Sequence, residues 1–561
     1  MFLFDFFRSF LPLHNPIGFG AADFLLFLIA ALLCLFTIAW RRAGQYAAIF
    51  AERTTWCMLL LAALPVVLRL ALLAGHPVPT PDIYDEFGHI FVADTLRHFR
   101  LANPPLRYPQ FFETFFILQQ PTYSAIYPIG QGLAMAIGWT LFGTPWAGVV
   151  LSTAGFCALC YWMLRGWTTA GWALVGGLLA VAEFGPLCEW MNTYWGGAFI
   201  ALGGCLVFGA LPRLSSAPRT RDAVLLALGL AINWLTRPYE SLFLFLAVIV
   251  WFLPAVRIPD QLRRLGKVAP EVALILGTAF AISLFQNKAV TGSWTTMPES
   301  LSQYEYGVPA SLTFQADPVP HRQLTAQQAL DYRMQMGFRS HPETLITYLE
   351  RLEYRVRYYR FFYFAPLYVA LFAFLGCLRQ YRYLWVAGTC LLFALGTNFF
   401  PAFQLHYVAA CTCLFVLISV AGLQQVQRFS PAAARLILFL CAAQFLFWYT
   451  IHFYDGTNLA ISMEPYETWD NLNYRNPERR IYVRNQLDAI KGDLLIFVRY
   501  YPQHVFQDEW VYNRADINSS RIIYARDLGP EENQKLIAEY PDRTVLLLEP
   551  DFRPPRITSY E

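Results

Sequence analysis

An acidic run at residues 81–89, PDIYDEFGH, holds the residues best suited to chemistry in this sequence. Adjacent carboxylates such as Asp85 and Glu86 can work as a general base. One would deprotonate an acceptor hydroxyl while the other fixes the geometry or binds a divalent metal. His89 closes the same run. The spacing is therefore compatible with a reaction in which a hydroxyl group becomes the nucleophile.

The alternative interpretation of this run is structural. A solvated acidic loop would cap a helix over residues 85–99, with Asp82 or Asp85 as an ordinary N-cap. Asp94, further along that helix, is expected to face outward and to have little role. The residues alone leave the catalytic and the capping interpretations open.

Two further constellations combine an ionisable side chain with groups that could hold a ligand. Glu189 and Asn192 lie in the run EWMNTYWGG. Aromatic belts at membrane surfaces explain its Trp and Tyr residues but not the acid and the amide. Arg237 and Glu240 lie in the run TRPYE, where the guanidinium fork could clamp a phosphate group. A local ion pair between Arg237 and Glu240 explains that run equally well.

Gln120 and Tyr123 lie in the uncharged run QQPTYSAIYP, for which a helix start containing a proline is the simpler explanation. No spacing of histidine, cysteine and aspartate resembles a defined zinc site. No cofactor is assigned, and a requirement for a divalent metal stays open.

The elements that must position these residues are membrane helices. Of 561 residues, 56% are hydrophobic and 14% are charged, whereas a soluble globular chain is about a quarter charged. Apolar stretches near the roughly 20 residues that a spanning helix needs recur through most of the chain. We expect an integral, multi-pass protein of the bacterial inner membrane. The net charge of +3 is too small to indicate a nucleic-acid partner.

Lys and Arg concentrate in cytoplasmic loops, so they orient the chain. Four short connectors hold twelve Lys and Arg residues against two Asp and Glu residues: 41–54, 213–221, 255–267 and 379–382. Placing all four inside predicts about twelve crossings, both termini outside, and outer loops over 75–146 and 289–358. It also requires that the short, glycine-containing segment 128–143 be a re-entrant or juxtamembrane helix that does not cross.

The chain divides into three expected parts: an interfacial segment over 1–21, a helical membrane domain over 22–452, and a charged tail over 464–561. The tail alternates strand-like runs with helix-like ones, which predicts a small α/β layer. The strand-like runs begin at 494, 521 and 544, and the helix-like runs cover 481–490 and 530–539. The expected fold class is an all-α membrane bundle with a small extracytoplasmic α/β domain at its C-terminus.

The order of these features resembles the GT-C fold glycosyltransferases, most closely the branch of aminoarabinose and protein mannosyltransferases. Asp85 and Glu86 stand where that branch carries an Asp-Glu pair in its first outer loop. Glu189 stands where an acid follows two spans later, although its context departs from the plain Asp-Pro of the family. Thr236-Arg237-Pro238 is similar to the basic helix start that contacts the lipid phosphate. The resemblance covers roughly residues 55–450.

The resemblance implies an inverting transfer of a sugar from a polyprenyl-phosphate donor to a glycan, lipid or protein acceptor at the extracytoplasmic face. Asp85 or Glu86 would be the base, and Arg237 would steady the departing phosphate. Donor or substrate contacts would come from the remaining candidates: Glu240, Glu189, Asn192, His89, Gln120 and Tyr123. Two alternatives are a glycan ligase or polymerase of the same fold and a transporter or flippase for a lipid-linked sugar. Charged groups near the outer ends of the spans, with none at the midplane, argue against a transporter.

Overall fold

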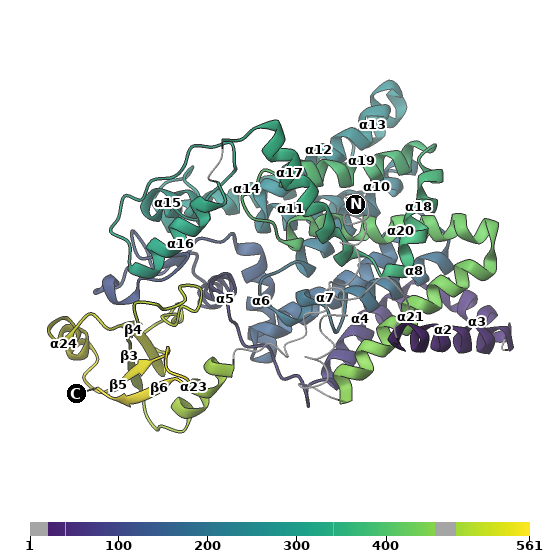
Figure 1. Ribbon diagram of the computed structural model, residues 1–561. Helices are drawn as coiled ribbons and strands as arrows, with labels where there is room; N and C mark the ends of the chain where they lie inside the picture. Colours follow the sequence, from purple (N-terminus) through teal and green to yellow (C-terminus); the bar gives the residue numbers. More distant parts are fainter. Residues whose placement is uncertain (1–20, 40, 340–341, 455–477, 561) are drawn as a thin grey trace.

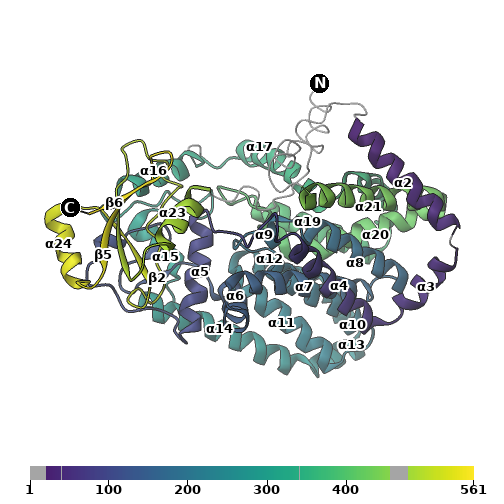
Figure 2. The same ribbon diagram turned by 90° about the horizontal axis from the view of Figure 1, so that it is seen from below.

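The computed structural model describes residues 21–39, 41–339, 342–454 and 478–560. The expected interfacial segment 1–21 lies outside this part of the chain, except for Ala21. A bundle of helices forms most of the molecule, and a small sheet lies at one end of it beside α15 (Pro298–Tyr306) and α16 (Ala326–Gly337) (Figure 1). Figure 2 shows the same arrangement from below, with α2 and α3 at the end of the bundle away from the sheet.

Seven helical segments among the described residues are long and apolar enough to cross a membrane. They are α4 (Thr54–Ala71), α7 (Pro145–Leu164), α10 (Ala198–Ser216), α12 with η2 (Pro238–Arg257), α14 (Ala269–Thr291), η6 with α20 (Leu405–Phe429) and α21 (Pro431–Tyr454). An eighth is counted if Leu345–Phe362 and Ala365–Cys377, which meet at 108°, form one bent span. The chain is therefore an integral membrane protein, as its composition predicts.

The expected number of crossings, about twelve, exceeds this count because several apolar helices are short. α8 (Ala170–Phe184), α11 (Thr220–Thr236) and α19 (Tyr381–Thr397) have 15, 17 and 17 residues. At about 1.5 Å per residue they reach roughly 22–26 Å, against a hydrocarbon core of about 30 Å. Helices of this length cross where the bilayer thins or where neighbours shield their ends. Length and composition support seven or eight crossings, and the additional ones remain a prediction.

The segment that we expect not to cross is α6 (Ile129–Phe142). Its 14 residues reach roughly 21 Å. It packs very closely on α7, since a Cβ atom on Gly138 would lie 2.0 Å from the backbone nitrogen of Gly148. Small residues at such a contact let two membrane helices approach each other. The glycines therefore serve the packing of α6, and its return to the outer surface remains a prediction.

Seven further helices are described, and the last two of them belong to the bent pair. They are α2 (Ala21–Ala39), α3 (Arg41–Ala51), α5 (Tyr84–Arg97), α9 (Glu189–Asn192), α13 (Pro259–Gly266), α17 (Leu345–Val356) and α18 (Tyr368–Phe374), with short 3-10 turns between several of them. α5 lies in residues 75–146, the first predicted outer loop, and α15 and α16 lie in residues 289–358, the second predicted outer loop; both keep these names below.

The C-terminal sheet has the strand order β4 (Ile522–Arg526), β3 (Leu494–Val498), β5 (Thr544–Glu549), β6 (Arg556–Ser559). β3 pairs in parallel with β4 and β5, and β6 is antiparallel to β5. The central strand β3 is buried along its whole length, which is typical of a parallel strand covered on both faces. The three strands predicted from the sequence are present, as are α23 (Glu478–Asp488) and α24 (Pro530–Glu539). β6 was not predicted, because it is a short, largely polar edge strand.

One buried guanidinium joins the sheet to both outer loops. Arg526, at the end of β4, pairs with the fully buried carboxylate of Glu509. It also donates to the backbone oxygen of Glu113 at 2.6 Å and to Oε1 of Gln327, on α16, at 3.1 Å. The side chains of Phe111 and Phe112 extend the same junction by packing into the core of the sheet. The sheet and the two outer loops therefore form one packed unit.

Asp94 corrects a prediction from the sequence. The expectation that it faces outward is wrong, because Asp94 is 2% exposed. One of its oxygens accepts a hydrogen bond from the backbone nitrogen of Ala515 at 3.0 Å, and the other lies 3.4 Å from Arg97. The C-terminal region covers this face of α5, and no pattern within α5 could indicate that.

Two arginines of the same sheet, Arg526 and Arg556, should differ strongly in their contribution to the free energy of unfolding. Arg526→Met should lower the free energy of unfolding by about 3–5 kcal/mol, because it leaves the Glu509 carboxylate buried without its partner. Thermal unfolding of the purified protein in detergent would measure this loss. Arg556→Met is the control, since Arg556 is 57% exposed and its ion pair with Glu549 lies at the surface. Equal shifts of the melting temperature in the two variants would contradict the role of Arg526.

Candidate functional site

The two adjacent acids in the N-terminal turn of α5, Asp85 and Glu86, have different hydrogen-bond partners. Glu86 accepts hydrogen bonds from three backbone N–H groups: Asp82 at 2.9 Å, Ile83 at 3.4 Å and Tyr194 at 2.9 Å. Glu86 lies in the first turn of α5 and caps the start of the helix by binding the backbone of Ile83. The structural interpretation of the sequence gave this capping role to Asp82 or Asp85. The bond to Tyr194 also ties α5 to the chain that follows α9.

Asp85 is left free to act on a ligand. Consecutive helical residues point about 100° apart, so Asp85 leaves the cap and faces Tyr127. The Tyr127 hydroxyl donates to Oδ1 of Asp85 at 2.6 Å. Burial raises the pKa of Asp85 to about 6, while this hydrogen bond and the charge of Arg237 act in the opposite direction. A carboxylate with a pKa near 6 is mostly ionised at neutral pH and is a stronger base than an ordinary aspartate.

Tyr127 holds the Asp85 face of α5 in place through its ring. A Cβ atom on Gly88 would lie 2.3 Å from that ring, so the contact requires glycine. The ring also packs on the imidazole of His89, with 4.1 Å between centroids. Burial lowers the pKa of His89 to about 3, and the charge of Arg237 adds to the effect, so this imidazole is neutral. His89 can therefore offer a hydrogen bond but carries no charge.

Arg237 lies at the break between α11 and α12, where the fixed backbone of Pro238 starts the second helix. Its guanidinium lies 4.7 Å from the ring centroid of Tyr407 and 3.7 Å from Oε1 of Glu240. The side chain keeps 26% of its surface exposed. The ion pair that the sequence left open is present, but it is long and engages one carboxylate oxygen.

The second outer loop adds two acids that the sequence analysis did not single out. Glu299, on α15, is exposed at the surface of the chain; desolvation by its surroundings raises its pKa, and the charge of Arg237 acts in the opposite direction. Asp331, on α16, is fully buried, and both of its oxygens accept from Nε2 of Gln335 at 3.0–3.1 Å. Burial raises the pKa of Asp331 to about 7, with a contribution from the charge of Asp85. The two outer loops therefore meet around Asp85 and Arg237, and no local motif marks these partners.

Glu189 and Asn192 lie beside this group in different environments. Burial raises the pKa of Glu189 to about 7, and the charge of Glu86 adds to the effect. The Asn192 amide is occupied by structural bonds, since its oxygen accepts from Nε of Arg69 at 2.7 Å. Its nitrogen donates to the backbone oxygens of Pro186 and Cys188, at 3.0 and 2.8 Å.

Gln120 and Tyr123 are not brought to Asp85. Tyr123 is 2% exposed and packs edge-on against Phe91, with 4.8 Å between ring centroids. Phe91 lies six residues along α5 from Asp85, roughly 9 Å along the helix axis. Gln120 lies on the exposed surface of the loop.

Tyr127 and Tyr407 are two further contacts of the site that the sequence analysis did not select as candidates. Tyr127 stood within a run already noted, but an uncharged tyrosine near a proline carries no specific signal. Tyr407 lies some 170 residues beyond Arg237 in the sequence. Among the described residues, no group of three or more His, Cys, Asp and Glu side chains is arranged to hold a metal ion.

No protein-family model and no curated protein matches this sequence. Among solved structures, ArnT from Cupriavidus metallidurans bound to undecaprenyl phosphate matches with a TM-score of 0.50 and 12% identity, over 88% of this chain and 92% of that one. The apo state of the same protein matches with a TM-score of 0.48 and 12% identity, over 89% and 93%. The Archaeoglobus fulgidus oligosaccharyltransferase in complex with Zn and sulfate matches with a TM-score of 0.40 and 11% identity, over 87% and 67%. The chain therefore has the GT-C fold, as the order of its acidic and basic motifs indicated.

Proposed function

We propose that this protein is a lipid-dependent glycosyltransferase that moves a sugar from a polyprenyl-phosphate donor to an acceptor hydroxyl at the extracytoplasmic face. The observation that carries the proposal is that Asp85 lies within electrostatic range of Arg237. Asp85 is a carboxylate that the Tyr127 hydroxyl orients and whose pKa is near 6, and the charge of Arg237 acts on it. The guanidinium of Arg237 makes one long ion pair with Glu240. The structural neighbour with undecaprenyl phosphate supports a lipid phosphate as the donor's leaving group.

The reaction follows from these two groups. Asp85 takes the proton of the acceptor hydroxyl, and the hydroxyl oxygen attacks the anomeric carbon. The bond from that carbon to the phosphate oxygen breaks with inversion, and the phosphate keeps the electron pair. Arg237 stabilises the developing charge, because its fork matches two phosphate oxygens. Glu86 holds α5 in position and takes no part in the proton transfer.

The remaining candidates take supporting roles in this proposal. His89, Glu189 and Glu240 surround the pair and would contact the sugar or the phosphate. A divalent metal bound by the acids stays open. The division into a membrane domain over 22–452 and an extracytoplasmic domain over 464–561, about twelve crossings and both termini outside belong to the same proposal.

Asp85→Asn should lower the transfer rate by about 10²–10⁴-fold, because it removes the base. Its melting temperature should stay near that of the unchanged protein, since Asp85 makes one side-chain bond and does not cap α5. Glu86→Gln should instead lower the melting temperature, because the amide cannot accept the same three N–H bonds. Transfer from a polyprenyl-phosphate sugar and thermal unfolding, both on purified protein, would separate the two effects.

Glu350→Gln is the control for these variants, since Glu350 is an exposed acid on α17 of the second outer loop. It should leave both readouts unchanged. A near-normal rate in Asp85→Asn would contradict the assignment of the base.

The pH dependence should report the same carboxylate. Because the ionised form of Asp85 is the active one, kcat/KM should rise as the pH increases through about 6 and then level off. Arg237→Gln should move this limb to higher pH, since the charge of Arg237 lowers the pKa of Asp85. It should also raise KM for the donor. Arg237→Lys should bring the apparent pKa of the pH profile back toward its original value but should leave the KM for the donor raised, because an ammonium supplies the charge without the fork. A limb that does not move in Arg237→Gln would show that the titrating group is not Asp85.

Reporter fusions test the orientation. Fusions at 216 and 262 should read as cytoplasmic, and fusions at 100, 320 and 500 should read as extracytoplasmic. The bias of Lys and Arg among the four connectors is the reason for this expectation. A cytoplasmic reading at 320 or 500 would place the second outer loop or the sheet on the wrong side for the proposed site.

A further inference from the structure

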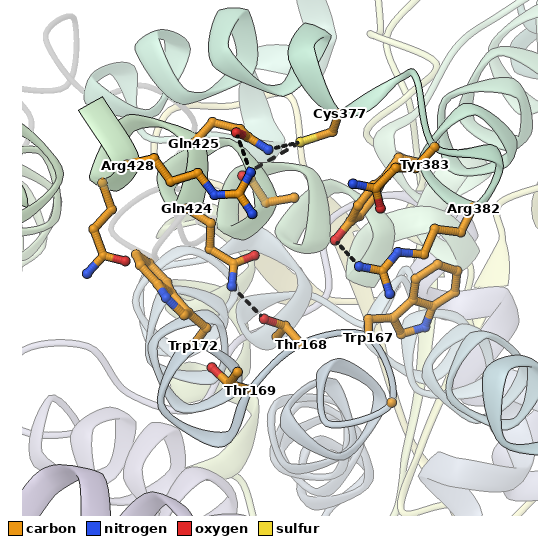
Figure 3. Close-up of a pocket in the computed structure, with 14 residues that line it drawn as sticks. Trp167, Thr168, Thr169, Trp172, Cys377, Arg382, Tyr383, Gln424, Gln425 and Arg428 are labelled. Atoms are coloured by element: carbon orange, nitrogen blue, oxygen red, sulfur yellow. Dashed lines mark hydrogen bonds between the residues drawn. The ribbon is translucent and has the colours of Figure 1, made fainter. Parts of the chain in front are cut away.

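A cavity of about 520 Å³ opens at a place that the proposed reaction does not use. It lies between the turn from α7 to α8, the turn from α18 to α19 and the C-terminal end of α20 (Figure 3). Its volume falls within the range of sites that hold small ligands. The side chains that define its chemistry are Thr168, Trp172, Arg382, Gln424, Gln425 and Arg428.

The continuous span Leu405–Phe429 shows how far this cavity lies from the candidate active site. Its first turns place Tyr407 against Arg237, and its last turns place Gln425 and Arg428 in the cavity. The 18 residues from Tyr407 to Gln425 reach roughly 27 Å along a helix. The cavity therefore lies at the opposite end of the bundle, beside the basic connector 379–382.

The described residues of the cavity wall include two arginines and four glutamines, together with aromatic and hydroxyl side chains, and none of them is a carboxylate. Arg382 packs on the Tyr383 ring at 4.6 Å and donates to its hydroxyl at 3.0 Å. Arg428 donates to Oε1 of Gln425 at 3.2 Å. Among the described residues, neither arginine forms an ion pair with a carboxylate, so most of their N–H donors are available.

The amides of the wall are held in place by neighbours, as the dashed lines in Figure 3 show. Gln424 donates to the Thr168 hydroxyl at 2.8 Å, and Gln425 donates to the buried Cys377 sulfur at 3.1 Å. These bonds join α20 to the turns on both sides of the cavity. The site is therefore preorganised before any ligand binds, which reduces the entropy lost on binding.

We propose that this cavity binds the phosphodiester headgroup of an anionic phospholipid from the leaflet on this side of the membrane. Two guanidinium groups supply the charge and the fork geometry for the phosphate oxygens. Basic pockets between membrane helices on the cytoplasmic side are suited to such headgroups. Large apolar side chains that flank the cavity residues in sequence are exposed, namely Leu375, Tyr381 and Phe429 at 60%, 52% and 88%. They favour a lipid over a free phosphate ion, because acyl chains would cover them.

Lipid binding to the full-length protein in detergent tests this proposal, measured by native mass spectrometry with phosphatidylglycerol and with phosphatidylcholine. Phosphatidylglycerol should bind more tightly. The double variant Arg382→Gln/Arg428→Gln should raise its Kd roughly 30-fold, since each arginine near a membrane surface contributes about a factor of five. The Kd of the double variant Arg382→Lys/Arg428→Lys should lie between that of the unchanged protein and that of the glutamine variant, because lysine retains the charge without the fork. The measurement needs no sugar transfer, so its outcome is independent of the proposed reaction.

Arg263→Gln/Arg264→Gln is the matched control. It removes the same charge from the exposed helix α13, which lies within the basic connector 255–267, and should leave the Kd within a factor of about two. Equal loss in this control would overturn the proposal, as would equal binding of phosphatidylcholine. Inorganic phosphate is the last arm: displacement of phosphatidylglycerol by millimolar phosphate alone would show that the cavity takes a free anion rather than a headgroup.

Discussion

The candidate site depends on the hydrogen bonds that the Glu86 carboxylate accepts from three backbone N–H groups. This carboxylate completes the first turn of α5, binds the loop before that helix, and reaches across to the backbone of Tyr194. Three N–H donors on one buried carboxylate leave it little freedom to rotate. Because its neighbour projects from a different side of the same helix turn, this restraint sets the direction of Asp85. An acidic pair thus combines one residue that holds the backbone with one that remains available for chemistry.

The outer loops surround Asp85 because the sheet holds them there. Arg526 bonds to Glu113 in the first outer loop and to Gln327 in the second, while Glu509 neutralises its charge. Asp94 adds a second connection from the other end of α5 to the C-terminal region. Each connection joins segments hundreds of residues apart in the sequence. The position of α5 is therefore linked to how the C-terminal region packs on these loops.

The two ends of the bundle differ in their charged groups. At the Arg237 end, Asp85 and Glu299 have raised pKa values and lie within range of the charge of one guanidinium. At the other end, the cavity is lined by arginines that have no carboxylate partner among the described residues, which suits stable binding of an anion. The span Leu405–Phe429 contributes to both ends and is among the most buried helices of the bundle. A lipid bound at one end would thus contact the helix that carries Tyr407 at the other.

Much of the architecture follows from local patterns in the sequence. Long apolar runs identify the membrane helices, since a spanning segment must satisfy its backbone within itself. The proline after Arg237 marks a helix break, and alternating runs mark three strands of the tail. The acidic pair at Asp85 and Glu86 could be found for the same reason, because adjacent ionisable residues at a membrane edge are costly and therefore informative.

Only the tertiary structure decided which of these groups do what. The sequence could not tell the capping acid from the free one, because that depends on where the backbone of Tyr194 lies. It placed Asp94 in solvent, because the partner that buries it comes from Ala515, 421 residues away. It overlooked Asp331 and Tyr407, which carry no motif and matter only through the packing of distant segments. Helix periodicity and hydrophobicity are local properties, whereas a site is a set of distances between residues that the sequence keeps far apart.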